Sequence, residues 1–169
     1  ATMTIDRARR QLISSLASIY DEREASSISS LVMERITKMS RGVRVIHKTD
    51  SFNEEQVTLF QQYLEELMRH RPVQYVLGEA WFTGLRFQVD ENVLIPRPET
   101  EELVDWILAG LPNPLPPDFR ALDIGTGTGC IPISLGKKRK DIQLMACDIS
   151  PVALDIARKN SIANQVEIA

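Results

Sequence analysis

The stretch Ala121-Leu122-Asp123-Ile124-Gly125-Thr126-Gly127-Thr128-Gly129 decides how the second half of this chain folds. It starts as a short apolar run, as in a buried strand, and then places glycine at every second position. The apolar residues 130–135 follow, with Pro132 near their start, as in the first turn of a helix. Glycine permits positive φ and close approach of a ligand, and free N–H groups at a helix start attract polar or anionic groups. The pattern therefore predicts a strand, a ligand-binding loop and a helix.

A second strand is predicted at residues 142–147, and it ends at an acidic residue, Asp148. An acidic side chain about 20 residues beyond such a loop can accept hydrogen bonds from both hydroxyls of a ribose. Ser150 and Pro151 then suit the N-cap and the first position of another helix. This alternation of strands and helices predicts an α/β fold with a parallel sheet.

The spacing of the glycines separates two classes of cofactor. A dinucleotide-binding loop has its third glycine three residues after the second, where this chain has Cys130. The loop instead resembles the cofactor loop of class I methyltransferases, which bind S-adenosyl-L-methionine. The resemblance implies a cofactor-binding role for Asp123, Gly125, Thr126, Gly127, Thr128, Gly129 and Asp148. The alternative is a tight turn without a ligand, in which Asp123 caps the loop backbone.

The first 71 residues have a different character, with one glycine and no proline. Their apolar residues recur in steps of three and four over residues 5–19 and 28–36, which predicts two amphipathic helices. Because such stripes on short helices can only be buried against one another, we expect a small all-α bundle.

A third helix of this bundle has a strong start signal. Asn53 is a good N-cap, and Gln56 stands three residues later, as in a capping box. Phe52 and Val57 are spaced for a hydrophobic staple across the helix start. The helix should end near residue 71, because the residue before a proline avoids helical geometry.

Strand-like runs at residues 80–82 and 85–89 flank Thr83 and Gly84, and predict a β-hairpin. Farther on, Thr100 is a natural N-cap for an apolar helix. The sequence therefore predicts three parts: a helical domain at residues 1–78, a β-hairpin linker at 79–92, and an incomplete Rossmann-like class I methyltransferase domain at 93–169.

Composition narrows the class of protein. With 43% hydrophobic and 25% charged residues and no apolar run of roughly 18 residues, we expect a soluble, cytoplasmic protein without a membrane span. Cys130 and Cys147 have no metal-ligand spacing, so no metal site is expected. From residue 79 onward, 13 acidic residues outnumber 9 basic ones, which argues against direct contact with nucleic acid. The basic residues between Arg35 and Lys48 are a solvated surface or a contact for an acidic or RNA-associated partner.

Several motifs together resemble one family, the HemK/PrmC release-factor glutamine methyltransferases. They are Arg-Pro-Val-Gln-Tyr-Val-Leu-Gly at residues 71–78, Leu-Ile-Pro-Arg-Pro-Glu-Thr-Glu at 94–101, the glycine loop, and Asp-Ile-Ser at 148–150. The segment at 94–101 is the most diagnostic. The resemblance implies methylation, with S-adenosyl-L-methionine, of the glutamine side-chain amide in the GGQ motif of peptide-chain release factors. It also implies that the helical domain docks the release factor.

The family's Asn-Pro-Pro-Tyr motif, which holds the acceptor amide, does not occur in this chain. The nearest string, residues 113–117, has a different order and lacks the tyrosine, so no catalytic residue is assigned. Residues 165–168 resemble the start of a third strand, and we expect an inactive fragment of a longer protein.

Two other functions stay open at this point: a DNA or RNA amino-group methyltransferase, and a non-catalytic interaction module. Arg97, Glu99 and Thr100 either cap the following helix or line the cofactor pocket. The sequence does not identify the release factor or the oligomeric state.

Overall fold

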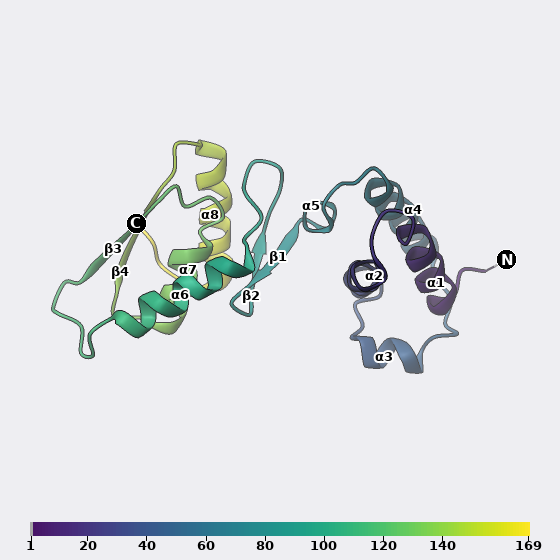
Figure 1. Cartoon of the computed structure of the whole chain (residues 1–169), viewed down its shortest axis with the longest axis horizontal. Helices are drawn as coiled ribbons and strands as arrows, with labels where there is room; N and C mark the ends of the chain where they lie inside the picture. Colours follow the sequence, from purple (N-terminus) through teal and green to yellow (C-terminus); the bar gives the residue numbers. More distant parts are fainter. Residues whose placement is uncertain (1) are drawn as a thin grey trace. The chain divides into compact units, whose positions relative to one another are not determined.

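The computed structural model describes residues 2–169, and its contacts divide the chain into two compact units, Ala1–Leu77 and Gly78–Ala169. Figure 1 labels the helices and strands of both units. Each unit has its own cluster of buried apolar side chains. Over residues 2–169, none of the helices combines the length and the apolar character that a membrane crossing requires.

The first unit is all-α, as the sequence predicts. Its described helices are α1 (Ile5–Leu16), α2 (Glu22–Thr37), α3 (Arg41–Ile46), α4 (Glu54–Met68) and α5 (Val73–Leu77). Helices α1, α2 and α4 pack against one another and bury one stripe each. Leu12, Leu16, Val32 and Leu67 are fully buried between them. The short helices α3 and α5 are not predicted by the sequence pattern, because neither is long enough to show a helical period.

The predicted start of α4 is confirmed. The Asn53 side chain accepts the Gln56 N–H at 2.8 Å, and the Gln56 side chain accepts the Asn53 N–H at 3.0 Å. The helix ends at Met68, earlier than predicted, and His70 takes a left-handed conformation with φ 61°. Because a residue in the left-handed conformation ends a helix, His70 and not Pro72 determines where α4 ends.

In the second unit, β1 (Glu79–Phe82) and β2 (Leu85–Gln88) form the predicted antiparallel hairpin. Both turn residues, Thr83 (φ 49°) and Gly84 (φ 75°), have the positive φ of a tight two-residue turn. Phe82 and Phe87 pack edge to face at 6.2 Å and are buried in the core of this unit. Contacts thus assign the hairpin, for which the sequence predicts a separate linker, to the second unit.

The remaining elements are α6 (Pro98–Gly110), β3 (Arg120–Ile124), α7 (Cys130–Lys138), β4 (Gln143–Cys147) and α8 (Pro151–Asn164). Helix α6 begins at Pro98 with Arg97 at the N-cap position, so the prediction of Thr100 as N-cap is wrong. The physical reason is that proline, with its fixed φ and missing N–H, fits the first helical position well.

The strands β3 and β4 are parallel, in register from Arg120 opposite Gln143 to Ile124 opposite Cys147, and α7 connects them. Beyond β4, Ala169 donates to the Leu144 carbonyl and accepts from the Ala146 N–H, both at 3.0 Å. The order across the sheet is therefore β3, then β4, then residue 169 on the far side of β4. That order is half of a doubly wound sheet, and it confirms the Rossmann-like α/β class.

Candidate functional site

The glycine loop curls over the carboxyl ends of β3 and β4. Gly125, Gly127 and Gly129 have φ values of 77°, 55° and 77°. The Gly125 and Thr126 N–H groups both donate to the Cys147 carbonyl, at 2.9 and 3.0 Å, which ties the loop to the end of the neighbouring strand. In doubly wound sheets, ligands bind at this edge.

The three glycines serve different purposes. A Cβ atom at Gly125 or Gly127 would meet no atom within 4 Å, so the space above these residues is open. A Cβ at Gly129 would lie 3.1 Å from Ile133 Cδ1 and 3.3 Å from Ala157 Cβ. The first two glycines therefore leave room for a ligand, whereas Gly129 lets α7 and α8 approach each other.

Asp148 accepts hydrogen bonds from two backbone N–H groups, one of which belongs to the loop. Its Oδ1 accepts the Ser150 N–H and its Oδ2 accepts the Gly127 N–H, both at 2.9 Å. These two bonds, first that of Ser150, lower the pKa of the carboxyl below its usual value. The side chain is partly exposed. Because a carboxylate offers about four acceptor positions, Asp148 retains capacity for hydroxyl donors of a ligand.

Two polar atoms of the loop region have no hydrogen-bond partner among residues 2–169. They are Oδ2 of Asp123 and Oγ1 of Thr126, and both are buried. The alternative in which Asp123 caps the loop backbone is not seen among these residues. A buried polar atom without a partner is rare in folded proteins and calls for an explanation such as a bound ligand. A carboxylate oxygen in this position suits a positively charged donor.

Asn160 of α8, a residue of the family resemblance to which the sequence gives no role, bonds to the loop. Its side chain is 1% exposed; its Oδ1 accepts the Gln88 N–H at 2.6 Å, and its Nδ2 donates to the Gln88 and Thr128 carbonyls at 3.0 Å. The hairpin and the loop are thus joined through one side chain. The available signal was a polar residue in helical register with the buried Ala153 and Ile156.

The segment at 94–101 contributes through Glu101. Its carboxylate accepts the Thr83 N–H at 2.8 Å, and the Thr83 hydroxyl lies 2.7 Å from that of Ser134 on α7. Arg97 and Glu99 are exposed, and among the described residues no hydrogen bond or ion pair involves their side chains. The Arg97 carbonyl accepts the Thr100 N–H at 3.0 Å. The residue that connects this segment to the hairpin is therefore Glu101, which the sequence places in the first turn of the helix without predicting this contact.

Thr128 and Cys130 complete the loop as packing residues, and both are buried. Burial raises the pKa of the Cys130 thiol, with a smaller opposing effect from a hydrogen bond to Thr128. Cys130 is therefore uncharged at neutral pH. Cys147 is exposed. Among residues 2–169, the structure shows no group of three or more His, Cys, Asp or Glu side chains that would hold a metal ion.

Two family models match this chain. Residues 7–78 match the PrmC N-terminal domain, and residues 105–169 match the methyltransferase small domain. The two matches fall within the two units of the structure, apart from residue 78 at the boundary.

Several curated relatives are release factor glutamine methyltransferases. The chain is 41% identical to that of Flavobacterium psychrophilum over 167 residues, which are 98% of this chain and 59% of the relative. It is 45% identical to that of Streptococcus pneumoniae over 68% of this chain and 40% of the relative. It is 53% identical to that of Bacteroides thetaiotaomicron over 56% of this chain and 33% of the relative. The chain thus spans at most 59% of the length of these relatives.

Among solved structures, the tRNA (uracil-54, C5)-methyltransferase of Pyrococcus abyssi in complex with S-adenosyl-L-homocysteine is similar over 53% of this chain and 22% of that one. The sequence identity is 18% and the TM-score is 0.43.

Proposed function

Because this chain belongs to the HemK/PrmC family of release factor glutamine methyltransferases, we propose that it supplies the cofactor-binding part of such an enzyme. The cofactor is S-adenosyl-L-methionine, which carries a transferable methyl group on a sulfonium. The observation that carries the proposal is the pair of carboxylates at the loop: Asp148 with acceptor capacity left, and Asp123 with a buried oxygen lacking a partner.

The two carboxylates suit the two ends of this cofactor. Asp148 follows β4 and would accept hydrogen bonds from the ribose hydroxyls. Asp123 lies on the neighbouring strand β3 and would accept from the ammonium of the methionine part. The open backbone at Gly125 and Gly127 lets the ligand come close, and Thr126 offers a hydroxyl. Recognition at both ends would fix the orientation of the methyl group. A fixed orientation accelerates methyl transfer, because the reacting groups are already aligned.

We propose the glutamine side-chain amide in the GGQ motif of a peptide-chain release factor as the acceptor, with the helical unit helping to dock that protein. The names of the relatives support this assignment. An amide nitrogen is a weak nucleophile, so its alignment with the methyl group matters more than a strong base. No side chain of residues 1–169 is assigned to hold the amide. A cytoplasmic location follows from a substrate that acts in translation.

Calorimetric titration of the chain with S-adenosyl-L-methionine tests the cofactor site. We expect one cofactor per chain, and a loss of affinity of about tenfold or more for Asp148→Asn, because a hydrogen bond to a charged group contributes roughly that factor. The matched control is Asp155→Asn, an exposed carboxylate on α8 that pairs with Arg158. Equal affinities for the Asp148 variant and the parent chain would refute the assignment.

A pull-down with the cofactor-loaded chain tests the acceptor. We expect it to retain a release factor, and not to retain duplex DNA through residues 79–169, where acidic residues outnumber basic ones. Retention of nucleic acid without the release factor would favour an amino-group methyltransferase acting on DNA or RNA. Retention of the release factor by a chain that does not bind the cofactor would favour a non-catalytic interaction module.

A further inference from the structure

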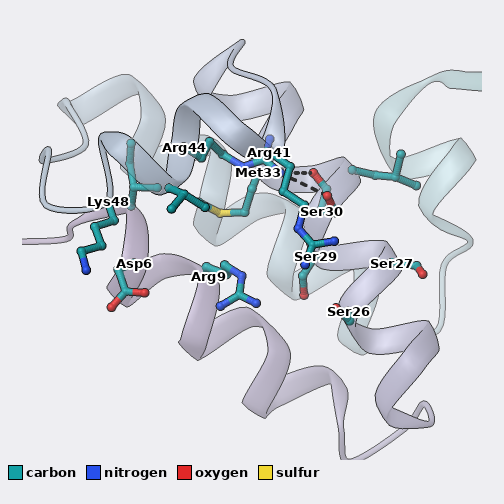
Figure 2. Close-up of a pocket in the computed structure, with 13 residues that line it drawn as sticks. Asp6, Arg9, Ser26, Ser27, Ser29, Ser30, Met33, Arg41, Arg44 and Lys48 are labelled. Atoms are coloured by element: carbon teal, nitrogen blue, oxygen red, sulfur yellow. Dashed lines mark hydrogen bonds between the residues drawn. The ribbon is translucent and has the colours of Figure 1, made fainter.

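The helical unit contains a cavity of about 640 Å³ that is separate from the glycine loop. It is formed by α1, α2, α3 and the segment that follows α3 (Figure 2). Its polar lining consists of Asp6, Arg9, Ser26, Ser27, Ser29, Ser30, Arg41, Arg44 and Lys48. Its apolar lining consists of Ile5, Leu31, Met33 and Val45. Basic groups and hydroxyls thus meet an apolar surface in one cavity.

Three of the cations in this cavity have no acidic partner among residues 2–169. Arg9, Arg41 and Lys48 are exposed, and none of them forms an ion pair with a described residue. The one carboxylate of the lining, Asp6, is paired with Arg10 outside the cavity. The cavity therefore has an excess of positive charge that the described residues do not neutralise.

The fourth cation, Arg44, is part of the wall. It is buried, and its guanidinium donates to the Met39 carbonyl at 2.6 Å. The guanidinium also donates to the Ser30 hydroxyl at 3.1 Å (Figure 2). Its pKa is lowered, first by burial and then by repulsion from Arg41 and Arg9, against an opposing effect of Glu34. Arg9 and Arg41 are therefore close enough to Arg44 to disfavour its charge, which a bound anion would relieve.

Ser29 provides a second, independent sign of a ligand. Its side chain lines the cavity and is 1% exposed, and its hydroxyl has no hydrogen-bond partner among the described residues. A serine on a helix commonly bonds back to the carbonyl four residues earlier, and Ser29 does not. A buried hydroxyl without a partner is expected to meet an acceptor from elsewhere.

Backbone hydrogen bonds join two of the segments that line the cavity. The Asp6 N–H donates to the Lys48 carbonyl at 2.9 Å, and the Ile5 N–H donates to the Asp50 carbonyl at 3.0 Å. These bonds attach the segment after α3 to the start of α1. The backbone of the lining is thus in place before a ligand arrives, which reduces the entropy lost on binding.

We propose that this cavity binds a phosphate ester of nucleotide size, either a free nucleotide or the terminal nucleotide of an RNA. Guanidinium forks, an ammonium and a hydroxyl are the donors that phosphate oxygens accept from. A phosphate monoester offers three such oxygens and two negative charges, which match three unpaired cations better than a single carboxylate does. The apolar lining suits the face of a base, and the volume falls in the usual range for small-molecule sites.

Calorimetry on the whole chain, with uridine 5′-monophosphate and uridine as probes, tests this proposal. Uridine compounds are chosen because the proposed cofactor site recognises an adenosyl group. We expect the monophosphate to bind about tenfold or more tightly than uridine. Arg9→Gln and Arg41→Gln should each lower the affinity for the monophosphate about tenfold, because each removes charged hydrogen bonds. Ser29→Ala should also weaken binding. Lys38→Gln, in the same basic stretch but outside the cavity lining, is the matched control and should bind as the parent does.

A uridine pentamer with and without a 5′-phosphate distinguishes the two sources of the phosphate. Tighter binding of the phosphorylated pentamer than of the monophosphate assigns the site to an RNA end, and equal binding assigns it to a free nucleotide. Asp148→Asn should leave monophosphate binding unchanged, so failure of the cofactor site and failure of this site are separable. The proposal is overturned if uridine and its monophosphate bind alike, if Lys38→Gln loses as much as Arg41→Gln, or if hexaglutamate binds more tightly than the monophosphate.

Discussion

Polar side chains behave differently in the two units. Behind the glycine loop, the buried Asn160 satisfies three backbone groups, and Glu101 accepts from the hairpin turn. In the cavity of the helical unit, the Ser29 hydroxyl has no partner among the described residues, and three guanidinium groups lie close enough to repel. The first set of polar groups stabilises the fold, whereas the unpartnered Ser29 hydroxyl and the repulsion of Arg44 by Arg9 and Arg41 are unfavourable to it.

This difference separates supporting residues from binding residues. Some groups assigned to ligand binding are left without internal partners, and the fold is less stable for it. Asp123 and Thr126 follow the same rule within the loop, since each has a buried oxygen without a partner among residues 2–169. Removing a supporting group should therefore destabilise the protein, whereas removing a binding group without an internal partner should not. Asp148 has both roles, because it accepts two backbone hydrogen bonds and keeps acceptor positions for a ligand.

The largest effect is expected for Asn160→Ala. It leaves the Gln88 N–H and the Gln88 and Thr128 carbonyls without their side-chain partner, and should lower the free energy of unfolding by about 3 kcal/mol. Urea unfolding followed by tryptophan fluorescence measures it, because both tryptophans, Trp81 and Trp106, lie in this unit. Asn164→Ala on the same helix, with an exposed bond to Arg86, is the control and should change stability much less.

The next effect sharpens the division of roles among the glycines. Gly129→Ala combines a positive φ with a Cβ placed 3.1 Å from Ile133, and should destabilise the second unit by about 2 kcal/mol. Gly127→Ala has the same backbone strain in open space, and should destabilise by about 1 kcal/mol. Cofactor titration should show the opposite order, with the greater loss for Gly127→Ala. Equal unfolding and binding losses for the two variants would contradict the assignment.

In the helical unit, removing a polar group of the cavity should not lower the free energy of unfolding. Ser29→Ala removes a hydroxyl without a partner, and should leave stability unchanged or raise it by up to about 1 kcal/mol. Arg41→Gln removes a charge that repels Arg44 and should act in the same direction. Thermal unfolding monitored by tyrosine absorbance measures both, since Tyr20, Tyr63 and Tyr75 all lie in this unit. A clear loss of stability in either variant would show that the group supports the fold.

The smallest effect concerns pH. Hydrogen bonds from Ser150 and Gly127 lower the pKa of Asp148 in the folded chain, so the carboxylate stabilises the fold above the unfolded pKa of about 4. This contribution is lost as the pH falls through the lower, folded pKa. Comparing the urea midpoints of the parent and Asp148→Asn between pH 6 and pH 3 measures it, and the difference between them should shrink toward acid. A difference that stays constant would exclude the linkage.

Local signals account for what the sequence predicts well. The capping box at Asn53, the hairpin turn at Thr83 and Gly84, and the cap at Ser150 each depend on residues a few positions apart, and all three are present. Asn160 bonds to residues 72 and 32 positions away, which no local pattern encodes. For the same reason, the sequence indicates the loop at 123–129 but not the side chain that holds it.

The cavity of the helical unit also depends on residues far apart in the sequence. The basic residues between Arg35 and Lys48 stand out in the sequence, but their combination with Arg9 and Ser29 depends on how α1, α2 and α3 pack. Leu31 illustrates this, because the helical stripe predicts it to be buried, whereas it is 39% exposed and lines the cavity. A residue that fits the periodicity but lines an open cavity can be recognised only in the folded chain.

The most direct test of the cofactor assignment is an amide NMR spectrum of the chain recorded during titration with S-adenosyl-L-methionine. If the loop between β3 and α7 holds the cofactor, the shifted amides should cluster at Gly125, Gly127, Asp148 and Ser150, and those of residues 26–48 should stay in place. Shifts confined to the cavity of the helical unit, or a spectrum that does not change, would contradict the central claim.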